Sequence, residues 1–396
     1  MGEVSIKALL DGVEVEWKML GEEDYFEVAN KGRKPVKASL RIQGETPYYG
    51  ANNIQDYVEG YTHDGEYALI AEDGSASLEN YSVQYATGKF WANNHVHVVQ
   101  GTSKVNTKFL YYYLKIVNFT PYLTGGGRAK LTKGKMLEIQ IPIPPLHVQR
   151  EIVRVLDNFT ELTAELTAEL SARKKQYSYY REKLLSFEEG EVEWRTLGDP
   201  EVGEFIRGKR FVKTDMKSEG IPCIHYGQMY TYYGIWADKS KSFVSPELVE
   251  AKKLRTAKKG DVIFVAAGET IEDIGMATAW FGDEDVVIHD ACFFYKSKLN
   301  AKYIAYYTRT NFFKNQIRKS VSSGKISAIN AKGLGKVIIP VPSPEEQERI
   351  VAILDKFDTL THSISEGLPR EIALRKKQYE HYRDLLLSFP KVGETA

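Results

Sequence analysis

Acidic side chains near the start of the chain are spaced as in a metal-dependent nuclease. Asp11 precedes Glu16-Trp17-Lys18, and this order matches the Asp…Glu-x-Lys pattern in which two carboxylates hold a metal ion. A second copy of the stretch reads Glu193-Trp194-Arg195, and each copy precedes a variable region instead of lying inside one. We therefore interpret both copies as structural and reject a nuclease site.

Other catalytic patterns are incomplete. The loop at residues 125–127 is Gly-Gly-Gly but lacks the Gly-Lys-Ser/Thr ending of a phosphate-binding loop. The sequence contains neither a glycine-rich strand-to-helix motif for S-adenosylmethionine nor an Asn/Asp-Pro-Pro-aromatic tetrad. His63, His95 and His97 are too loosely placed for a zinc site, so we expect hydrogen-bonding roles at strand ends. These absences leave binding as the expected function.

Composition is typical of a soluble, multidomain protein. The chain has 396 residues, 43% of them hydrophobic, and this length predicts two to three domains. It has neither an apolar run of 18 residues nor an N-terminal leader pattern, so we expect no membrane association and a cytoplasmic location. Cys223 and Cys292 fit a reducing compartment, where we expect two small buried side chains.

Charge is balanced overall but uneven along the chain. Net charge is zero, with 53 basic and 53 acidic residues, which argues against indiscriminate coating of polyanions. Residues 42–88 hold eight acidic residues and no Lys or Arg, whereas residues 101–140 hold seven basic residues and one acidic residue. Residues 296–336 hold ten basic residues and no acidic one. Basic stretches at like places in two halves favour binding to a polyanion over a merely solvated surface.

The chain is a tandem duplication. Residues 173–187 read RKKQYSYYREKLLSF, and residues 375–389 read RKKQYEHYRDLLLSF. The start of the chain, residues 7–20, resembles residues 183–197, so the first and last segments together complete one more junction. This order predicts pseudo-twofold symmetry with the two ends of the chain close together.

Two variable inserts lie between the repeated segments and share a mixed α/β plan. Residues 65–71 match residues 260–266 as a turn glycine followed by an apolar strand, and residues 109–114 match residues 303–308 as a helix. Each insert ends in a proline cluster, IPIPPLHVQ at 141–149 and IPVPSPEEQ at 339–347, which stops a helix before it and favours one after it.

Long helices with a narrow apolar seam follow the proline clusters. Steps of four and three from Ile152 to Phe187 reach apolar side chains at nine of eleven positions, so we expect one helix over residues 146–187 that is roughly 63 Å long. In the second copy, Gly367-Leu368-Pro369 predicts a break or kink. Two halves related by a twofold axis require antiparallel helices. The expected pairing residues are Leu156, Phe159, Leu166, Leu170, Tyr177, Tyr180, Leu184, Leu354, Phe357, Tyr379, Tyr382 and Leu386.

A tetrapeptide is repeated inside the first long helix. Residues 163–166 and 167–170 both read TAEL. One unit adds about 6 Å of helix and about 400° of rotation, which is about 40° past a full turn. A DNA base pair turns by about 35°, so a helix counted in such units could act as a ruler for the spacing of two half-sites. An ordinary leucine-rich helix explains the leucines but not the repeated tetrapeptide.

These repeats resemble the specificity subunit of type I restriction-modification enzymes, and the TAEL units resemble its IC subclass. The resemblance rests on residues 142–149 and 340–347, on IVRVLDNF at 152–159 and IVAILDKF at 350–357, and on the RKKQY…YR…LLSF pair; it covers nearly the whole chain. In the first insert, residues 48–54, 73–75 and 88–95 also look typical of the family. The second insert departs from the last two of these patterns, so we expect a different half-site.

The resemblance implies an α+β fold with two mixed α/β target-recognition domains related by pseudo-twofold symmetry and joined by two long antiparallel helices in a coiled coil. The implied domains are residues 1–145 and 191–343, with the helices at 146–190 and 344–390. It also implies that each domain reads half of a split, asymmetric site in double-stranded DNA. The helices would set the spacer and dock two methyltransferase subunits and then the restriction/translocase subunits. S-adenosylmethionine, ATP and Mg would bind to those partners, and this chain would bind no cofactor or metal and be non-catalytic.

Major-groove readout uses Arg, Lys, Asn and Gln side chains, and the phosphate backbone is held by Lys and Arg. Our candidates for DNA contacts in the first domain are Asn52, Asn53, Gln55, Arg128, Lys130 and Lys133. Those in the second domain are Tyr226, Gln228, Tyr230, Arg318, Lys319 and Lys325. For each, a structural role as a turn, strand or core-edge residue is the alternative.

Two other classes of function stay open. One is a fused methyltransferase or nuclease with an unrecognised motif, against which the missing motifs argue. The other is a coiled-coil assembly adaptor, against which the paired basic inserts argue. Whether the repeated RKKQY segments contact a methyltransferase or DNA is undecided by sequence.

Overall fold

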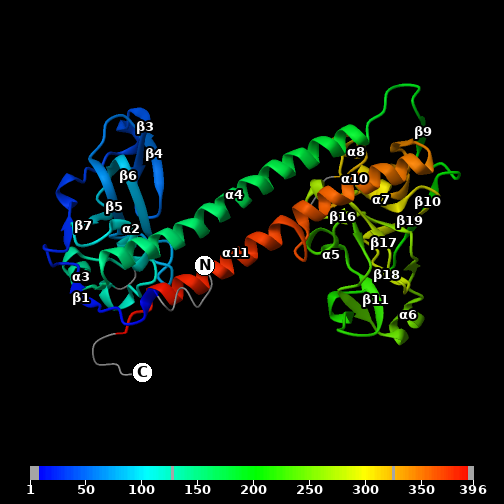
Figure 1. Ribbon diagram of the computed structural model, residues 1–396. Helices are drawn as coiled ribbons and strands as arrows, with labels where there is room; N and C mark the ends of the chain where they lie inside the picture. The colour runs from blue at the N-terminus through cyan, green and yellow to red at the C-terminus, as the bar shows by residue number, and fades with distance from the viewer. Residues whose placement is uncertain (1–8, 126–128, 323–325, 391–396) are drawn as a thin grey trace. The chain divides into compact units, whose positions relative to one another are not determined.

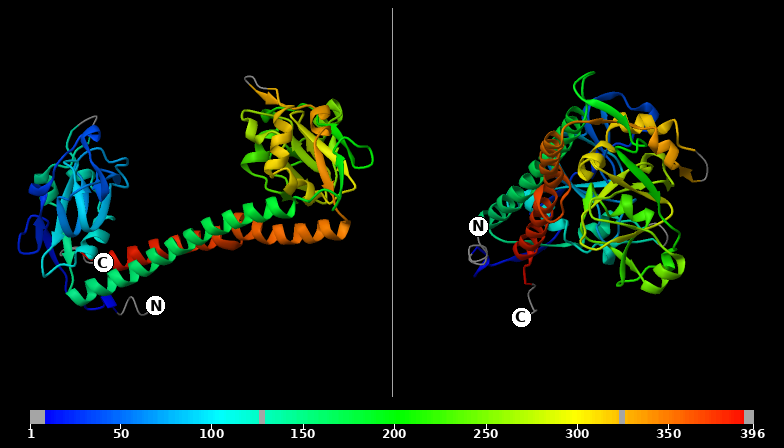
Figure 2. Two further views of the ribbon diagram at one scale, coloured as in Figure 1. Left: turned by 90° about the horizontal axis from the view of Figure 1, so that it is seen from above. Right: turned by 90° about the vertical axis from the view of Figure 1, so that its right-hand side faces the viewer.

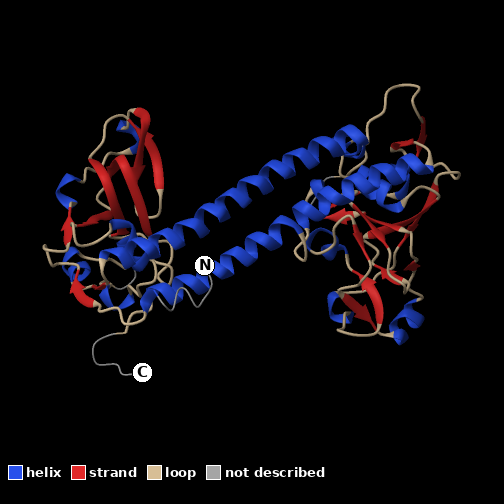
Figure 3. Ribbon diagram, viewed as in Figure 1, coloured by secondary structure: helices blue, strands red, loops and turns tan. Residues whose placement is uncertain are grey.

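The computed structural model describes residues 9–125, 129–322 and 326–390, which belong to two compact units. Unit 1 is Met1–Glu165 with Ile372–Ala396, and unit 2 is Leu166–Glu371. Each unit combines sheet and helix (Figures 1 and 3), so the predicted mixed α/β character is confirmed. The division cuts through two helices, and the four domain boundaries given above stay a prediction.

The sheet of unit 1 has six strands in the order β2-β7-β5-β6-β3-β4. Neighbours are antiparallel except β3 and β6, which are parallel. The strand bounds are β2 Phe26–Val28, β3 Gln43–Tyr49, β4 Ile54–Val58, β5 His63–Ala71, β6 Val83–Ala92 and β7 Val96–Gly101. Helix α2 (Thr107–Leu114) packs on this sheet, and its Leu110 and Leu114 are fully buried.

The main sheet of unit 2 has five strands in the order β10-β19-β15-β17-β12. Their bounds are β10 Gly203–Arg207, β12 Trp236–Ala237, β15 Val262–Val265, β17 Ala277–Trp280 and β19 Cys292–Ser297. A second sheet has the order β13-β11-β18-β14, with bounds β11 Ile221–Ile224, β13 Ser242–Val244, β14 Thr256–Ala257 and β18 Val286–Ile288. Strands β16 (Ala267–Gly268) and β20 (Ser327–Ala328) form a separate pair.

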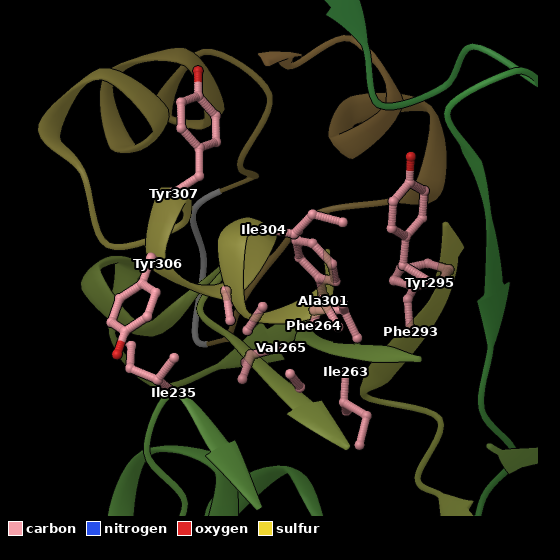
Figure 4. Close-up of a cluster of buried hydrophobic side chains, with 14 of the residues drawn as sticks. Ile235, Ile263, Phe264, Val265, Phe293, Tyr295, Ala301, Ile304, Tyr306 and Tyr307 are labelled. Carbon is pink, nitrogen blue, oxygen red and sulfur yellow. The ribbon is translucent and has the colours of Figure 1, made fainter. Parts of the chain in front are cut away.

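Short helices complete both units. In unit 2 they are α5 Tyr226–Thr231, α6 Pro246–Lys252, α7 Ala301–Tyr307, α8 Asn311–Arg318 and α9 Ala331–Gly335, and in unit 1 α3 Lys133–Leu137. The core of unit 2 gathers Phe264, Phe293, Tyr295 and Ile304 from β15, β19 and α7 (Figure 4). Tyr306 and Tyr307 leave α7 in opposite directions.

The two units share one five-strand plan. The order β2-β7-β5-β6-β3 in unit 1 corresponds to β10-β19-β15-β17-β12 in unit 2, with the last pair parallel in both. Even the register agrees, because Ala68 is paired with Val99 in unit 1 and Ile263 is paired with Phe294 in unit 2. Strands β5 and β15 are therefore equivalent in topology as well as in sequence. Gly260 precedes β15 as expected, whereas Gly65, expected in a turn, lies inside β5 and is paired with Gly88 of β6. The units differ beyond this plan, through β4 in unit 1 and the second sheet in unit 2.

Each unit also closes its insert with a two-stranded pair. In unit 1, β1 (Glu16–Met19) is antiparallel to β8 (Gln140–Ile143); in unit 2, β9 (Glu193–Thr196) is antiparallel to β21 (Ile338–Val341). The Glu-Trp-Lys and Glu-Trp-Arg stretches thus serve as strands. The proline clusters begin inside β8 and β21, and the long helices α4 and α10 start within them at Leu146 and Pro344, so the helix predicted after each cluster is present.

Helix α4 runs without interruption over Leu146–Leu184, three residues short of the expected end. In unit 1 its Phe159 stacks on Tyr382 of α11 (Gly367–Leu387), with ring centroids 5.2 Å apart. In unit 2 its Tyr180 stacks on Phe357 of α10 (Pro344–His362) at 5.4 Å, and Figure 2 shows α10 beside the C-terminal part of α4. The apolar seam is therefore used for helix packing within each unit.

A break separates α10 from α11, as expected from the Gly-Leu-Pro sequence. It occupies residues 363–366, and Gly367 begins the next helix. Gly367 has φ +77, and a Cβ placed there would come within 2.4 Å of the Thr359 carbonyl oxygen. Only glycine fits both conditions. Pro369 lies in the first turn of α11, where a missing backbone N–H does no harm.

The first and last described segments of the chain contact each other in unit 1. The Trp17 indole N–H donates a 3.2 Å hydrogen bond to the Pro390 carbonyl oxygen. Leu9, Leu10 and Phe389 pack against one apolar cluster. Among the described residues, no helix is long and apolar enough to cross a membrane.

Candidate nucleic-acid interface

Three of the predicted DNA-contacting residues lie in or beside the turn between β3 and β4. Asn52 and Asn53 are exposed in the turn, and Gln55 is exposed in β4 next to it. The Asn52 side chain donates to the Gly74 carbonyl at 2.8 Å and accepts from the Ala76 N–H at 2.8 Å. The Asn53 side chain accepts from the N–H of Ile54. Asn52 is thus bonded to the loop that holds Gly74 and Ala76, and Asn53 is bonded locally to Ile54; contacts of both with bases stay a prediction.

Lys130 lies beside the same loop, residues 72–76. Its ammonium group is 3.0 Å from a carboxylate oxygen of Glu72, whose other oxygen accepts from Arg33 at 2.7 Å. Although burial alone raises it, these two hydrogen bonds hold the pKa of Glu72 below its usual value. The structure therefore brings Lys130 and the Asn52 turn to one loop, and Glu72 holds the lysine there.

The other basic candidates of unit 1, Arg128 and Lys133, lie close to Lys130 in the sequence. Lys133 is exposed at the start of α3, where the side chain of Thr132 caps the helix. Arg128 lies outside the described residues. Lys133 has its ammonium group on the surface, as a phosphate contact requires.

The candidates of unit 2 lie on two separate helices. On α5, Gln228 accepts from the His225 N–H and donates to Ser242 at 2.6 Å, so its amide fastens the start of the helix to β13. Tyr226 packs against the imidazoles of His225 and His289, and Tyr230 is partly buried beside it. Their side chains thus have structural contacts, and a DNA contact stays a prediction for each.

Arg318 and Lys319 are exposed at the C-terminal end of α8. Helix α8 is held by Phe313 and Ile317, which are buried in the core of unit 2. The helix is therefore anchored by its apolar face while both basic side chains extend into solvent. Lys325, the third basic candidate, lies outside the described residues.

Five residues connect the insert of unit 1 to α4, and we call them the first anchor: Asn106, Lys108, Tyr112, Gln149 and Asp157. Gln149 is fully buried; its amide oxygen accepts from the Asn106 N–H at 2.8 Å, and its NH₂ donates to the Pro144 carbonyl at 2.7 Å. Asp157 accepts from Lys108 at 2.8 Å and from the Tyr112 hydroxyl at 2.6 Å. Burial, reinforced by Asp157, raises the pKa of Tyr112.

Unit 2 repeats this arrangement residue by residue in the second anchor: Asn300, Lys302, Tyr306, Gln347 and Asp355. The buried Gln347 accepts from the Asn300 N–H at 2.8 Å and donates to the Pro342 carbonyl at 2.9 Å. Asp355 accepts from Lys302 at 2.6 Å and from Tyr306 at 2.6 Å. Two units that differ in most of their sequence thus keep one polar connection between insert and helix.

Sequence reasoning did not select the anchors as functional residues. The signal was present, because Gln149 and Gln347 close the two proline clusters, and Asp157 and Asp355 lie inside the repeated IVxxLDxF motif. Their partners in and before α2 and α7 are 43 to 53 residues away from them in sequence, a separation that single-sequence patterns do not bridge.

The predicted seam residues fall into groups within the two units. In unit 1, Leu156, Phe159, Tyr379, Tyr382 and Leu386 belong to one apolar cluster. In unit 2, Tyr177, Leu184, Leu354 and Phe357 join the main core, and Tyr180 stacks on Phe357. Leu166 and Leu170 are half-buried. The role of the seam in pairing the two halves stays a prediction.

Residues that mimic other sites have local structural contacts. Glu16 forms an ion pair with Lys18 at 3.1 Å and accepts from Tyr25. His63 and His97 contact backbone carbonyls of Ala29 and Leu131 through their ring nitrogens. Within residues 9–125, 129–322 and 326–390, no group of three or more His, Cys, Asp or Glu side chains is placed to hold a metal ion.

The two cysteines are buried and free, which agrees with the expected packing role. Burial raises the pKa of the Cys223 thiol to about 12. This thiol is therefore protonated at neutral pH and is a poor nucleophile.

Comparisons with known proteins agree with this architecture. Residues 14–173 and 190–374 match the family model of the type I restriction modification DNA specificity domain. The chain is 48% identical over 398 residues to a putative type I restriction enzyme specificity subunit, S.HindORF215P, of Haemophilus influenzae, covering 97% of this chain and 98% of that protein. It is 34% identical over 426 residues to the EcoR124I/EcoR124II specificity subunit of Escherichia coli, covering 99% and 98%.

Solved structures share the fold at low identity. An S subunit of a type I restriction-modification system from M. genitalium aligns with a TM-score of 0.59 and 16% identity over 96% of this chain and 98% of its own. A chain from a structure of type I complex assembly and conformational transition aligns with a TM-score of 0.56 and 16% identity over 94% and 97%. The family model and the curated relatives carry the assignment: the chain belongs to the family of DNA specificity subunits of type I restriction-modification systems.

Proposed function

We propose that the recognition domain of each unit reads one half of a split, asymmetric target in double-stranded DNA. The observation that carries this proposal is the shared five-strand plan with its repeated anchor, onto which the two units add different surfaces. A common scaffold with unlike additions suits two half-sites of unlike sequence. The curated relatives, which match over nearly their full length, support the same reading.

The exposed basic side chains support contacts with the phosphate backbone. Lys133 in unit 1 and Arg318 and Lys319 in unit 2 extend from short helices into solvent. Such contacts position a protein on DNA without reading its sequence. Readout of bases is expected from the exposed β3–β4 turn of unit 1 and from the α5 region of unit 2.

The long helices are proposed to set the spacer, to pair as an antiparallel coiled coil and to dock two methyltransferase subunits, followed by the restriction/translocase subunits. Packing of α4 on α11 in unit 1 and on α10 in unit 2 supports the pairing. We further propose that the chain is non-catalytic, and that S-adenosylmethionine, ATP and Mg bind to the partner subunits. The exposed lysines of the RKKQY segments, Lys174, Lys175, Lys376 and Lys377, are proposed to contact either a methyltransferase or DNA.

Mapping of methylated adenines tests the proposal. Genomic DNA is sequenced from cells that express this chain with its methyltransferase partner, and from cells that express the methyltransferase alone. We expect methylation at one two-part motif with a fixed spacer, only when both chains are present. Methylation at the same motif in cells that lack this chain would mean that another protein recognises the DNA. Absence of methylation at a split motif would overturn the proposed function. Methylation by this chain alone would show it to be a catalyst.

A further inference from the structure

We infer that the two anchors are positioning devices: each holds its recognition domain at a fixed angle on the long helix and thereby sets how strictly the protein discriminates the spacing between half-sites. This inference rests on the proposed function. It assigns Asp157 and Asp355, with their Lys and Tyr partners, a role in spacing rather than in reading bases.

Each anchor connects three layers of its unit: the sheet, the short helix of the insert and the long helix. In unit 1 the Lys108 ammonium lies 5.4 Å from the ring of Tyr85 in β6 and 2.8 Å from Asp157 in α4. In unit 2 the Lys302 ammonium lies 4.5 Å from the ring of Trp236 in β12 and 2.6 Å from Asp355 in α10. One lysine thus contacts the sheet and the long helix at once. Since a cation over an aromatic ring and a charged hydrogen bond are both attractive, the lysine couples the orientations of sheet and helix.

The hydrogen bonds of the anchors depend on direction as well as on distance. Buried apolar packing tolerates small rotations, whereas a hydrogen bond weakens steeply as its angle bends. The Gln149 amide uses both its ends, on the N-terminus of α2 and on the proline turn before α4. Gln347 does the same before α10. A rotation of either recognition domain on its helix would break bonds at several points, so each anchor favours a single angle.

The position of the anchors separates them from base recognition. The anchors connect the five-strand sheet to the long helices, and both of these parts are common to the two units. They do not involve the surfaces in which the units differ. A residue that read bases would have no reason to be repeated in two domains with different half-sites. A residue that fixes geometry would be needed equally in both.

Spacing is sensitive to this geometry because DNA is a helix. Moving a half-site by one base pair shifts it by about 3.4 Å and rotates it by about 35°. A domain that is fixed on its helix cannot follow this rotation, whereas a domain loosened at its anchor can. Loss of an anchor should therefore relax the spacer requirement more than it weakens methylation at the native spacer.

The test measures methylation by the complete methyltransferase–specificity complex on duplexes that carry the two mapped half-sites. The spacer is native, one base pair shorter or one base pair longer. The variants are Asp157→Asn and Asp355→Asn, singly and together, with Lys108→Met and Lys302→Met as second variants that keep the aliphatic stem. Asn158→Ala and Lys356→Ala are matched controls, because these exposed residues are the next ones along the same helices.

We expect the ratio of rates between native and altered spacers to fall at least tenfold in each Asp variant. The control variants should keep the wild-type ratio. A lower rate on all three duplexes with an unchanged ratio, in both the Asp and the Lys variants, would overturn the inference and leave the anchors a merely structural role. Failure of wild-type complex to methylate any two-part site would instead count against the proposed function.

Discussion

The Tyr306 hydroxyl of α7 donates a 2.6 Å hydrogen bond to the Asp355 carboxylate of α10. Tyr112 and Asp157 repeat it at 2.6 Å between α2 and α4. Each bond joins a helix of a variable insert to a repeated helix, and each carboxylate also accepts from a lysine. The bond between Tyr306 and Asp355 therefore belongs to the scaffold of the protein, and its removal should have local and measurable effects.

Tyr306→Phe removes this bond and keeps the ring. A hydrogen bond to a charged group contributes about 1.5–3 kcal/mol, so the opening free energy of α7 amides should fall by about 2 kcal/mol. Hydrogen exchange followed by mass spectrometry measures this quantity for each peptide of the full chain. Tyr112→Phe is the reciprocal control and should affect α2 instead. Equal loss of protection in both units from either variant would contradict a local role.

Acidification should destabilise unit 2 through His225. Burial, with a smaller effect of His289, lowers the pKa of His225 to about 4, whereas an unfolded histidine titrates near pH 6.5. Between these values the unfolded chain binds a proton that native unit 2 does not bind. Stability is therefore complete above about pH 6.5 and falls toward pH 4, by up to about 3 kcal/mol.

Calorimetry of the full chain between pH 7.5 and about pH 4.5 checks this pH dependence. In His225→Gln the melting temperature of unit 2 should depend less on pH than in wild type, because the buried imidazole is gone. His147→Gln, which changes an exposed histidine, should keep the wild-type slope. An unchanged slope in His225→Gln would refute the assignment.

Deletion of Thr167–Leu170 should shorten the DNA spacer by about one base pair and leave both half-sites unchanged. The deletion removes about 6 Å and about 400° from α4, a net rotation of about 40°. Adenine-methylation mapping reports the new motif. Ala168→Ser keeps the helix length at an exposed position and should keep the native spacer. A changed half-site sequence in the deletion variant would exclude the ruler.

Lys133→Ala should weaken binding to all DNA sequences and lower the salt dependence. Each lost phosphate contact reduces the slope of log affinity against log salt by about 0.9. Binding of the specificity–methyltransferase complex is titrated at several salt concentrations on target and non-target duplexes. Lys135→Ala is the control, because Lys135 forms an ion pair with Glu138 in the next turn at 2.8 Å. A sequence-dependent loss in Lys133→Ala would indicate base readout instead.

Sequence patterns predicted the repeated elements well because those elements are encoded locally. The helix expected over residues 146–187 is α4 at Leu146–Leu184, and the break expected near Gly367 separates α10 from α11. The strand expected after Gly260 is β15, and the one expected after Gly65 is β5, which already begins at His63. Heptad spacing, proline and glycine determine the backbone within a few residues, so their effects can be predicted from the sequence alone.

The candidate DNA contacts were less accessible to sequence reasoning. Asn52 and Gln228 have the amide chemistry that reads bases, yet the fold gives both amides partners of their own. Lys130 is held by Glu72, which is 58 residues earlier in the chain. The type of a side chain does not reveal which neighbouring group will form its hydrogen bonds or ion pairs in the folded protein.

By itself, the sequence determined the duplication, the family and the course of the long helices, because repeats and periodicity are properties of the chain. Only the tertiary structure decided that Gln149 and Asp157 meet Asn106, Lys108 and Tyr112, and that the second copy repeats these bonds. The physical reason is that an anchor depends on distance and direction in space. Those quantities exist only after the sheet, the insert helix and the long helix have packed together.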